Sequence, residues 1–273
     1  MIKRYIKILL TTLFLVTILL VIIKEFKKSV HEIRGEYTKK QSVNSSINGQ
    51  KPVYNTPDIE LNEIDENKHS WIAIDRKDSY NNELQLYSRD NVTFDEDSIV
   101  IISKKEIIDD KIYTSGLVES TEAFKYGYFE FEIEISKGKG LFPAIWLLPI
   151  SGGPLPEIDI FEMIGSEPNK FYGVVHFEEN NMRGRDYFEH MVSEKEQYTV
   201  ALKWDAEFLT WYIDEQQIYT TTKGVPHEYM YIIINQAVGG NWPGSPDDNT
   251  IFPNHFKILS TNINPTFREG RDL

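Results

Sequence analysis

Three acidic residues stand close together on a short, otherwise apolar stretch, Glu157-Ile-Asp-Ile-Phe-Glu162. Isoleucine and phenylalanine favour a buried β-strand, where unpaired negative charge is costly. Because strand side chains alternate between faces, Glu157 and Asp159 should point one way and Glu162 the other. One extra residue, a β-bulge, would return Glu162 to the first face, and bulges are common beside active sites. The spacing therefore predicts a bulge between Asp159 and Glu162, with all three acids on one face.

Two carboxylates about 5 Å apart are the working groups of a retaining glycosidase. One attacks the anomeric carbon, while the other protonates the leaving oxygen and then activates water. A third acid between them can hold a proton and separate their pKa values, because closely spaced like charges do not all ionise. The spacing alone equally allows a solvated strand face or a divalent-ion site, so the surrounding sequence has to decide.

The sequence around the acids resembles glycoside hydrolase family 16, in its laminarinase-like, endo-β-1,3(4)-glucanase branch. That branch carries the Glu-x-Asp-x-x-Glu form with the extra residue. The similarity covers roughly residues 70 to 255, and its motifs follow one another in the family's order. The motifs are Asn81-Asn-Glu-Leu-Gln-Leu-Tyr87, Tyr113-Thr-Ser-Gly116, Tyr126-Gly-Tyr-Phe-Glu130, Gly140-Leu-Phe-Pro-Ala-Ile-Trp-Leu-Leu-Pro149, Glu157 to Gly165, Val175-His-Phe177, Trp211-Tyr-Ile-Asp214 and Asn235-Gln-Ala-Val-Gly-Gly-Asn-Trp-Pro-Gly244.

The resemblance implies an all-β fold, a concanavalin A-like jelly-roll β-sandwich with a sugar-binding cleft on its concave sheet. It also implies retaining hydrolysis of a β-linked polysaccharide, usually a β-1,3- or mixed-linked glucan. By position, Glu157 would be the nucleophile, Asp159 the assisting acid and Glu162 the general acid/base.

Four further residues are candidate sugar contacts. The resemblance places Trp146 and His176 along the cleft, and Asn81 where the family often contacts a sugar. Without the resemblance, Trp146 reads as a core aromatic on an apolar strand, and His176 as a hydrogen-bonded structural residue. Trp242 lies in a Gly-rich loop, and exposed loop aromatics often bind ligands.

The chain departs from the family at positions that bear on the substrate. Glu132 stands where the family commonly has a sugar-contacting Arg in a Glu-x-Arg segment, and Phe142 replaces a Trp before Pro-Ala. The segment 256–262 lacks the usual Asp of the final strand. These departures leave the three acids intact. We expect no cofactor and no metal: a structural calcium is compatible with the resemblance, but nothing in the sequence supports it.

Length, charge and composition exclude several other classes. The chain has 273 residues and a net charge of −13, of which the first 28 residues contribute +5 and the remainder −18. The acidic remainder of the chain disfavours nucleic acid and strongly anionic polymers as partners, whereas a neutral glycan is compatible with it. The absence of cysteine excludes disulfides, thiolate chemistry and Cys-based zinc sites. No Gly-x-Ser-x-Gly elbow and no Walker or dinucleotide loop is present.

The N-terminal segment has the pattern of a membrane anchor. Residues 8–23 form an uncharged apolar run of 16 residues with Lys and Arg on both sides. A helix of this length spans about 24 Å, slightly less than a bilayer's hydrocarbon core. The run is long for a signal peptide, and no small-x-small cleavage site follows it. We therefore expect one N-terminal transmembrane helix, a single pass through the cell membrane and an extracytoplasmic enzyme; secretion after cleavage is the alternative.

The remaining chain divides into a linker and one domain. Residues 29–68 are polar and read as a stalk, after the anchor of residues 1–28. Residues 69–273 hold short strands separated by turn signals and no convincing long helix, which indicates a β-sandwich or barrel. In residues 128–135 apolar and acidic residues alternate strictly. The acidic row, Glu130, Glu132 and Glu134, either lines the cleft or forms a solvated face.

Three functions are compatible with these features. The first is a membrane-anchored retaining endo-glycosidase, expected to be a monomer, acting on a polysaccharide. The second is a transglycosylase that remodels a cell-surface or capsular polysaccharide, in which a sugar hydroxyl replaces water as the acceptor. The third is a glycan-binding module without catalysis, which the retention of all three acids disfavours.

Overall fold

The computed structural model describes residues 71–95 and 98–271, and these residues form an all-β fold. Within them no α-helix is present, and the single helical element is a 3-10 turn, η1 (Arg89–Asn91). This confirms the all-β prediction. The strands are β1 (Trp71–Ala73), β2 (Gln85–Tyr87), β3 (Val92–Asp95), β4 (Ser98–Ser103), β5 (Tyr113–Ser115), β6 (Leu117–Glu134), β7 (Leu141–Pro149), β8 (Glu157–Met163), β9 (Lys170–Glu179), β10 (Met182–Met191), β11 (Gln197–Trp204), β12 (Leu209–Ile213), β13 (Gln216–Thr221), β14 (Met230–Val238) and β15 (Asn254–Gly270).

β2 and β5 form a separate two-stranded parallel sheet. The other strands build two packed layers that share one long, bent strand, β6. The first half of β6 pairs with β14, which continues the order β14-β7-β8-β9-β10; we call this layer sheet I. The second half pairs with β11, followed by β12 and β13, and on its other side with β15, which leads to β4 and β3; we call this layer sheet II. Tyr126 and Gly127, both with positive φ, lie where the two halves meet.

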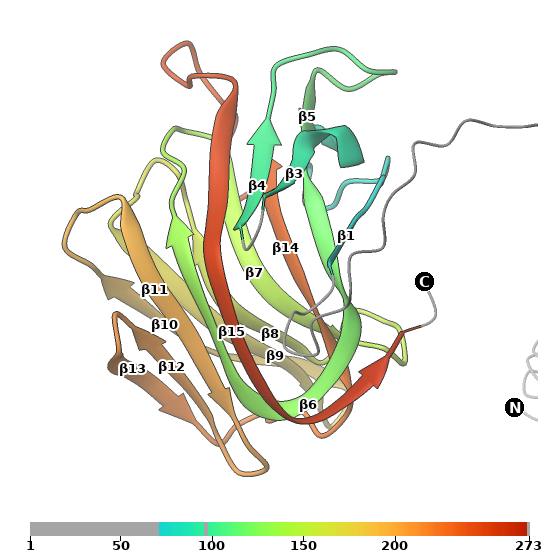
Figure 1. Ribbon diagram of the computed structural model, residues 1–273, viewed down its shortest axis with the longest axis vertical. Helices are drawn as coiled ribbons and strands as arrows, with labels where there is room; N and C mark the ends of the chain where they lie inside the picture. The colour runs from blue at the N-terminus through green and yellow to red at the C-terminus, as the bar shows by residue number, and fades with distance from the viewer. Residues whose placement is uncertain (1–70, 96–97, 272–273) are drawn as a thin grey trace, which may run out of the picture. The chain divides into compact units, whose positions relative to one another are not determined.

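The last strand, β15, follows β6 through the same bend. Lys257 pairs with Glu134 at one end of β15, and Gly270 pairs with Glu122 at the other. Figure 1 shows the two strands curving together from one layer into the other. A strand that passes through both layers fixes their relative position, so the residues of sheet I and those of sheet II are held in one frame.

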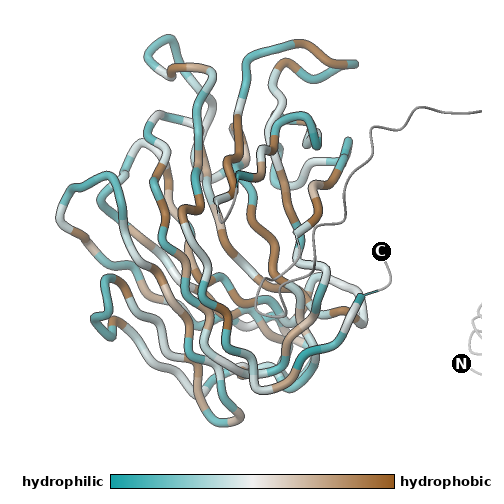
Figure 2. Tube along the Cα trace, viewed as in Figure 1, coloured by the Kyte–Doolittle hydropathy of each residue, from teal (hydrophilic) through white to brown (hydrophobic). Residues whose placement is uncertain are grey.

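The hydrophobic core lies between the two sheets. Sheet II contributes Phe129 and Phe131, while Ile158 and Phe161 come from the acid-bearing strand β8 of sheet I, and all four are almost fully buried. Figure 2 shows hydrophobic residues along the strands and hydrophilic ones in many connecting loops. Burying this apolar face against the opposite layer is what stabilises each sheet.

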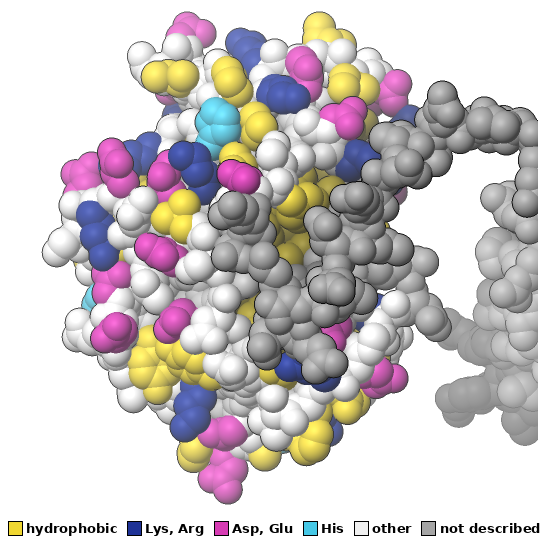
Figure 3. Space-filling model, viewed as in Figure 1, with side chains coloured by type: hydrophobic (Ala, Val, Ile, Leu, Met, Phe, Trp, Pro, Cys, Tyr) yellow, Lys and Arg dark blue, Asp and Glu magenta, His cyan; other side chains and the backbone are white. Residues whose placement is uncertain are grey.

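The acidic row of β6 is on the outer face of sheet II. Because Phe129 and Phe131 point into the core, Glu130, Glu132 and Glu134 must point away from it. Lys257 forms an ion pair with Glu134 at 2.6 Å, and Ser260 contacts Glu132 at 3.3 Å. The row is therefore a solvated face, one of the two alternatives the sequence allowed. In Figure 3 acidic side chains are spread among basic ones over the visible face and form no single patch.

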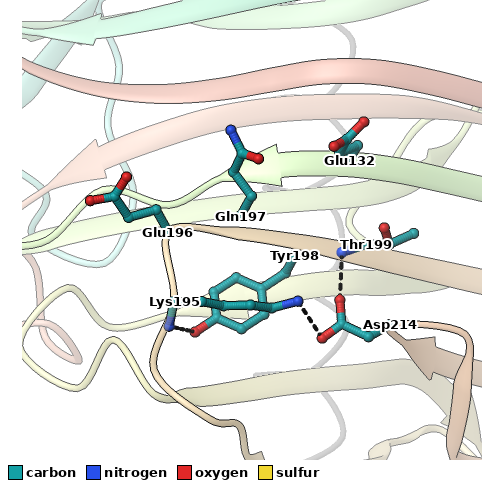
Figure 4. A pocket seen from close by; sticks show the side chains of 7 residues that line it. All are labelled: Glu132, Lys195, Glu196, Gln197, Tyr198, Thr199 and Asp214. Carbon is teal, nitrogen blue, oxygen red and sulfur yellow. Dashed lines mark hydrogen bonds and ion pairs between the residues drawn. The ribbon is translucent and has the colours of Figure 1, made fainter.

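The position of Glu132 corrects one expectation from the resemblance. This residue lines a surface depression of about 590 Å³, together with Lys195, Glu196, Gln197, Tyr198, Thr199 and Asp214 (Figure 4). The depression lies on sheet II, and the acids of β8 lie on sheet I. Glu132 is thus on the opposite outer face of the sandwich from the acids, and it does not stand in place of a sugar-contacting Arg at the site.

The expected anchor and linker, residues 1–28 and 29–68, lie outside the described residues. Among the residues that the structure describes, no helix is long and apolar enough to cross a membrane. The transmembrane prediction therefore stays a prediction.

Candidate active site

The predicted β-bulge is present in β8. On the β9 side, Asp159 pairs with Val174 and Glu162 pairs with Tyr172, and the register shifts between these two pairs. On the β7 side, Trp146 pairs with Asp159, and the next residue in register, Ile145, pairs with Phe161. Ile160 is therefore the extra residue. The shift confirms the prediction made from the spacing of the acids.

The bulge brings the three acids to one face of sheet I. Their partners on β9, His176, Val174 and Tyr172, are alternate residues of one strand, and alternate residues point the same way. The apolar residues between the acids, Ile158, Ile160 and Phe161, are buried in the core. Glu157, Asp159 and Glu162 thus lie on the outward face of sheet I, which we call the acid face.

Burial shifts the pKa of all three acids upward. It raises the pKa of Glu157 to about 7, against the opposing charge of Arg183. Burial and then the charge of Glu157 raise the pKa of Glu162 to about 8. Asp159 is 3% exposed, and burial, followed by the charges of Glu162 and Glu157, raises its pKa well above the usual range. As the pH rises through neutral, Glu157 therefore ionises before Glu162.

His176 completes this cluster from β9. Its Nε2 lies 3.7 Å from an oxygen of Glu157 and 3.5 Å from Oδ2 of Asp159. Burial, followed by the charges of Arg185 and Arg183, lowers the pKa of His176, so the ring is neutral at neutral pH. A neutral imidazole beside two carboxyl groups can hold them in place without fixing both as anions.

Trp146 is half-buried on the acid face, next to Asp159 in register. Its Nε1 donates a hydrogen bond to Oδ1 of Asn235 at 2.8 Å, and Nδ2 of Asn235 donates to the Tyr87 hydroxyl at 2.8 Å. Asn235 and Tyr87 are both buried. The indole is thereby fixed beside the acids, where an aromatic ring can form the floor of a sugar-binding site.

Trp242 lies at the Glu162 end of the acid row. Its ring centroid is 4.8 Å from that of Tyr172, the residue that pairs with Glu162, and 5.2 Å from that of Phe142. Its side chain is 46% exposed, so one side of the ring remains available to a ligand.

Asn81 belongs to a turn that supports the Trp242 loop. Its carbonyl oxygen accepts a hydrogen bond from the backbone N–H of Asn241 at 2.9 Å. Asn82 adds a side-chain hydrogen bond to Asn241 at 2.8 Å. The structure therefore brings Asn81 to the loop that carries Trp242, whereas His176 lies at the Glu157 end of the row.

Sequence reasoning missed Asn235 and Tyr87, which hold Trp146, and Tyr172, which packs on Trp242. Asn235 and Tyr87 stand inside motifs that carry the resemblance, Asn235 to Gly244 and Asn81 to Tyr87. Their motif membership was the available signal. Nothing in the spacing shows that they meet, because the three strands that carry them are far apart in the sequence.

Glu157, Asp159 and His176 are also the one group among the described residues that could ligate a metal ion, with potential ligand atoms within 4.8 Å of one another. Oδ2 of Asp159 is buried and has no hydrogen-bond partner. A metal ion would need both carboxyl groups deprotonated, and burial raises the pKa of each of them. Carboxyl groups with raised pKa values can also hold and transfer protons near neutral pH.

The two-layered all-β fold and its similarity to solved glucanases define the chain as a glycoside hydrolase by class. The family model described as "Glycosyl hydrolases family 16" matches residues 79–255, well over half of the chain. The chain belongs to this family.

Relatives of known name lie in the laminarinase-like part of the family. The chain is 34% identical over 152 residues to Endo-1,3-1,4-beta-glycanase ExsH of Rhizobium meliloti (strain 1021), a match that covers 54% of this chain and 32% of the relative. The endo-β-1,3-glucanase from Pyrococcus furiosus has a TM-score of 0.65 and 28% identity, over 73% of this chain and 89% of that one. The laminarinase catalytic domain from Thermotoga maritima MSB8 has a TM-score of 0.65 and 27% identity, over 72% and 92%. The chain spans about a third of the length of the first curated relatives.

Proposed function

We propose that this chain is a retaining endo-glycosidase that hydrolyses a β-linked polysaccharide, of the β-1,3- or mixed-linked glucan type, at the cell membrane. One observation carries the proposal: three carboxyl groups lie on one sheet face because of a bulge in β8. Similarity to an endo-1,3-1,4-β-glycanase and to an endo-β-1,3-glucanase supports the substrate class. The apolar run of residues 8–23 supports the membrane location.

In this proposal each acid has its own role. Glu157, with its pKa raised to about 7, is the group that reaches the anionic form first and attacks the anomeric carbon. Glu162, with its pKa raised to about 8, keeps the proton that the leaving oxygen takes up. Once that proton has left, Glu162 accepts a proton from water while the water oxygen attacks the anomeric carbon. The bond between this carbon and the Glu157 oxygen breaks, which releases Glu157 as a carboxylate and leaves Glu162 protonated again.

Asp159 lies between these two acids and interacts electrostatically with both. Its deep burial favours the protonated form of its carboxyl group, and we propose that this group donates a hydrogen bond to the Glu157 carboxylate once the nucleophile ionises. When Glu157 becomes an ester in the covalent intermediate and loses its charge, this hydrogen bond weakens. Asp159 thus stabilises the anionic form of the nucleophile on both sides of the reaction.

The test is turnover of the full-length protein with laminarin and mixed-linked β-glucan, and with β-1,4-glucan as the comparison. Glu157→Gln and Glu162→Gln should each lower kcat by at least about 10²- to 10⁴-fold. Glu132→Gln, on the other outer face, should leave kcat unchanged. Oligosaccharides are detected by mass spectrometry. Full activity in both glutamine variants would refute the site.

Azide separates the two roles. In Glu157→Ala, azide can take the place of the missing nucleophile and should give an α-glycosyl azide in one displacement. In Glu162→Ala, azide attacks the glycosyl–enzyme bond and should give a β-glycosyl azide. The reverse pattern would exchange the roles of the two residues. Product anomers are read by NMR.

A further inference from the structure

A tryptophan from the opposite layer donates a hydrogen bond to the backbone of the acid strand. Trp211 lies on β12 in sheet II and is 1% exposed. Its Nε1 donates to the carbonyl oxygen of Asp159 at 2.9 Å. Asp159 is the last residue of β8 that is in register before the bulge. The hydrogen bond therefore connects sheet II to the point where the acid strand changes register.

A glycine on β9 makes room for this indole. Gly173 stands between Val174, which pairs with Asp159, and Tyr172, which pairs with Glu162, so it faces the bulge. A Cβ on Gly173 would lie 2.4 Å from Cε1 of Phe188 and 2.7 Å from Nε1 of Trp211. Any side chain at this position would push the indole away, because real Cβ atoms do not approach that closely.

The indole has little freedom to move. Its ring lies against Phe188 at a centroid distance of 5.9 Å and against Tyr219 at 6.0 Å. The Tyr219 hydroxyl in turn donates to Asp186 at 2.7 Å. An indole fixed by packing on two sides is a rigid donor, and a rigid donor holds its acceptor in place.

We propose that Trp211 is a positioning residue: through the Asp159 carbonyl it fixes the bulge of β8, and thereby the spacing of Glu157, Asp159 and Glu162. Trp211 contacts no acid side chain in this role. It acts on the backbone that carries them, and Gly173 is the second part of the device. This inference rests on the proposed hydrolase function of the acids.

The experiment compares two buried tryptophans in the full-length protein. Trp204 is also 1% exposed, lies on β11 of sheet II, and donates its Nε1 to the carbonyl oxygen of Pro226 at 3.1 Å, away from β8. Trp211→Phe and Trp204→Phe each remove an indole N–H and part of a ring from the core. Trp211→Phe should lower kcat about 10- to 100-fold with little change in KM, because small misplacement of catalytic groups is costly. Trp204→Phe should leave kcat within about twofold of the wild type.

A second variant isolates the hydrogen bond. Benzothienylalanine at position 211 keeps the ring shape and replaces the N–H by sulfur, so it folds without a cavity. It should reproduce most of the loss in kcat. If this variant keeps wild-type kcat, or if the two phenylalanine variants lose kcat equally, Trp211 is structural and the proposal fails.

A readout without turnover separates this inference from the proposed function. The stability of each variant is measured by urea unfolding between pH 5 and pH 9. Loss of the Trp211 hydrogen bond should change the pH dependence of stability, since the acids shift relative to one another. Trp204→Phe should lower the free energy of unfolding by the same amount at every pH, so that its curve runs parallel to that of the wild type. A wild type that cleaves no glycan refutes the function alone, whereas parallel curves for both variants refute the positioning role.

Discussion

At the scale of single residues, the raised pKa values of the acids set the pH range of activity. Turnover needs Glu157 ionised and Glu162 protonated, and their pKa values lie near 7 and 8. The plot of kcat/KM against pH should therefore be bell-shaped with its maximum between these values. Initial rates on a soluble glucan from pH 4 to pH 10 measure it. A maximum near pH 4.5 would contradict the assignment.

The same acids make the folded protein less stable as the pH rises. A carboxyl whose folded-state pKa is raised binds its proton more tightly in the folded state than in the unfolded state. Its stabilising contribution is complete below the unfolded pKa of about 4.3 and is lost as the pH rises through the folded value. For Glu162 this window runs up to about pH 8.

Glu162→Gln should therefore increase the free energy of unfolding at pH 8 by about 1–3 kcal/mol and change it little at pH 4. Chemical denaturation at the two pH values measures the difference. Glu132→Gln, on the solvated face of sheet II, is the control. It should change the free energy of unfolding by the same small amount at pH 4 and at pH 8. An equal effect of Glu162→Gln on the free energy of unfolding at both pH values would mean that burial does not raise the pKa of Glu162.

At the scale of elements, the bend of β6 depends on Gly127. Its φ is +140°, and a Cβ would lie 2.6 Å from the carbonyl oxygen of Asn264 and 2.6 Å from Cα of Pro265 on β15. Both contacts are backbone atoms, which cannot move aside easily. Gly127→Ala should therefore lower the free energy of unfolding by about 2–4 kcal/mol.

Gly270→Ala is the matched control for this bend. Gly270 lies on β15, the strand that pairs with β6 along the bend, but nothing lies within 4 Å of a Cβ added to it. The free energy of unfolding of Gly270→Ala, measured by thermal or urea unfolding, should stay within about 0.5 kcal/mol of the wild-type value. Equal stability of both variants would show that the bend does not need a glycine.

The elements also show how far sequence reasoning reaches. The alternation in residues 128–135 predicted a strand with one apolar and one acidic face, and the spacing of the acids predicted the bulge, because both depend on the two-residue period of a strand. The first half of β6 and its bend at Tyr126 were missed, since the period continues on either side of a turn that only backbone dihedrals reveal. The contact of Trp211 with Asp159 was beyond reach, because it joins strands of different layers.

At the scale of the whole molecule, the N-terminal segment should decide where the enzyme works. We propose that residues 1–28 keep the chain in the membrane. The full-length protein should then stay in the membrane pellet after an alkaline carbonate wash, and a chain that starts after residue 28 should not. A soluble product shortened at its N-terminus would instead show cleavage and secretion. Mass spectrometry of the isolated protein distinguishes the two outcomes.

The pairing of β15 also bears on the order of events during synthesis. β15 follows every other described strand in the sequence, yet it pairs with β4 and with both halves of β6. Both layers therefore remain incomplete until β15 has been translated, and pairings between such distant segments form slowly. The same delay leaves the edges of β4 and β6 open to other chains until β15 arrives.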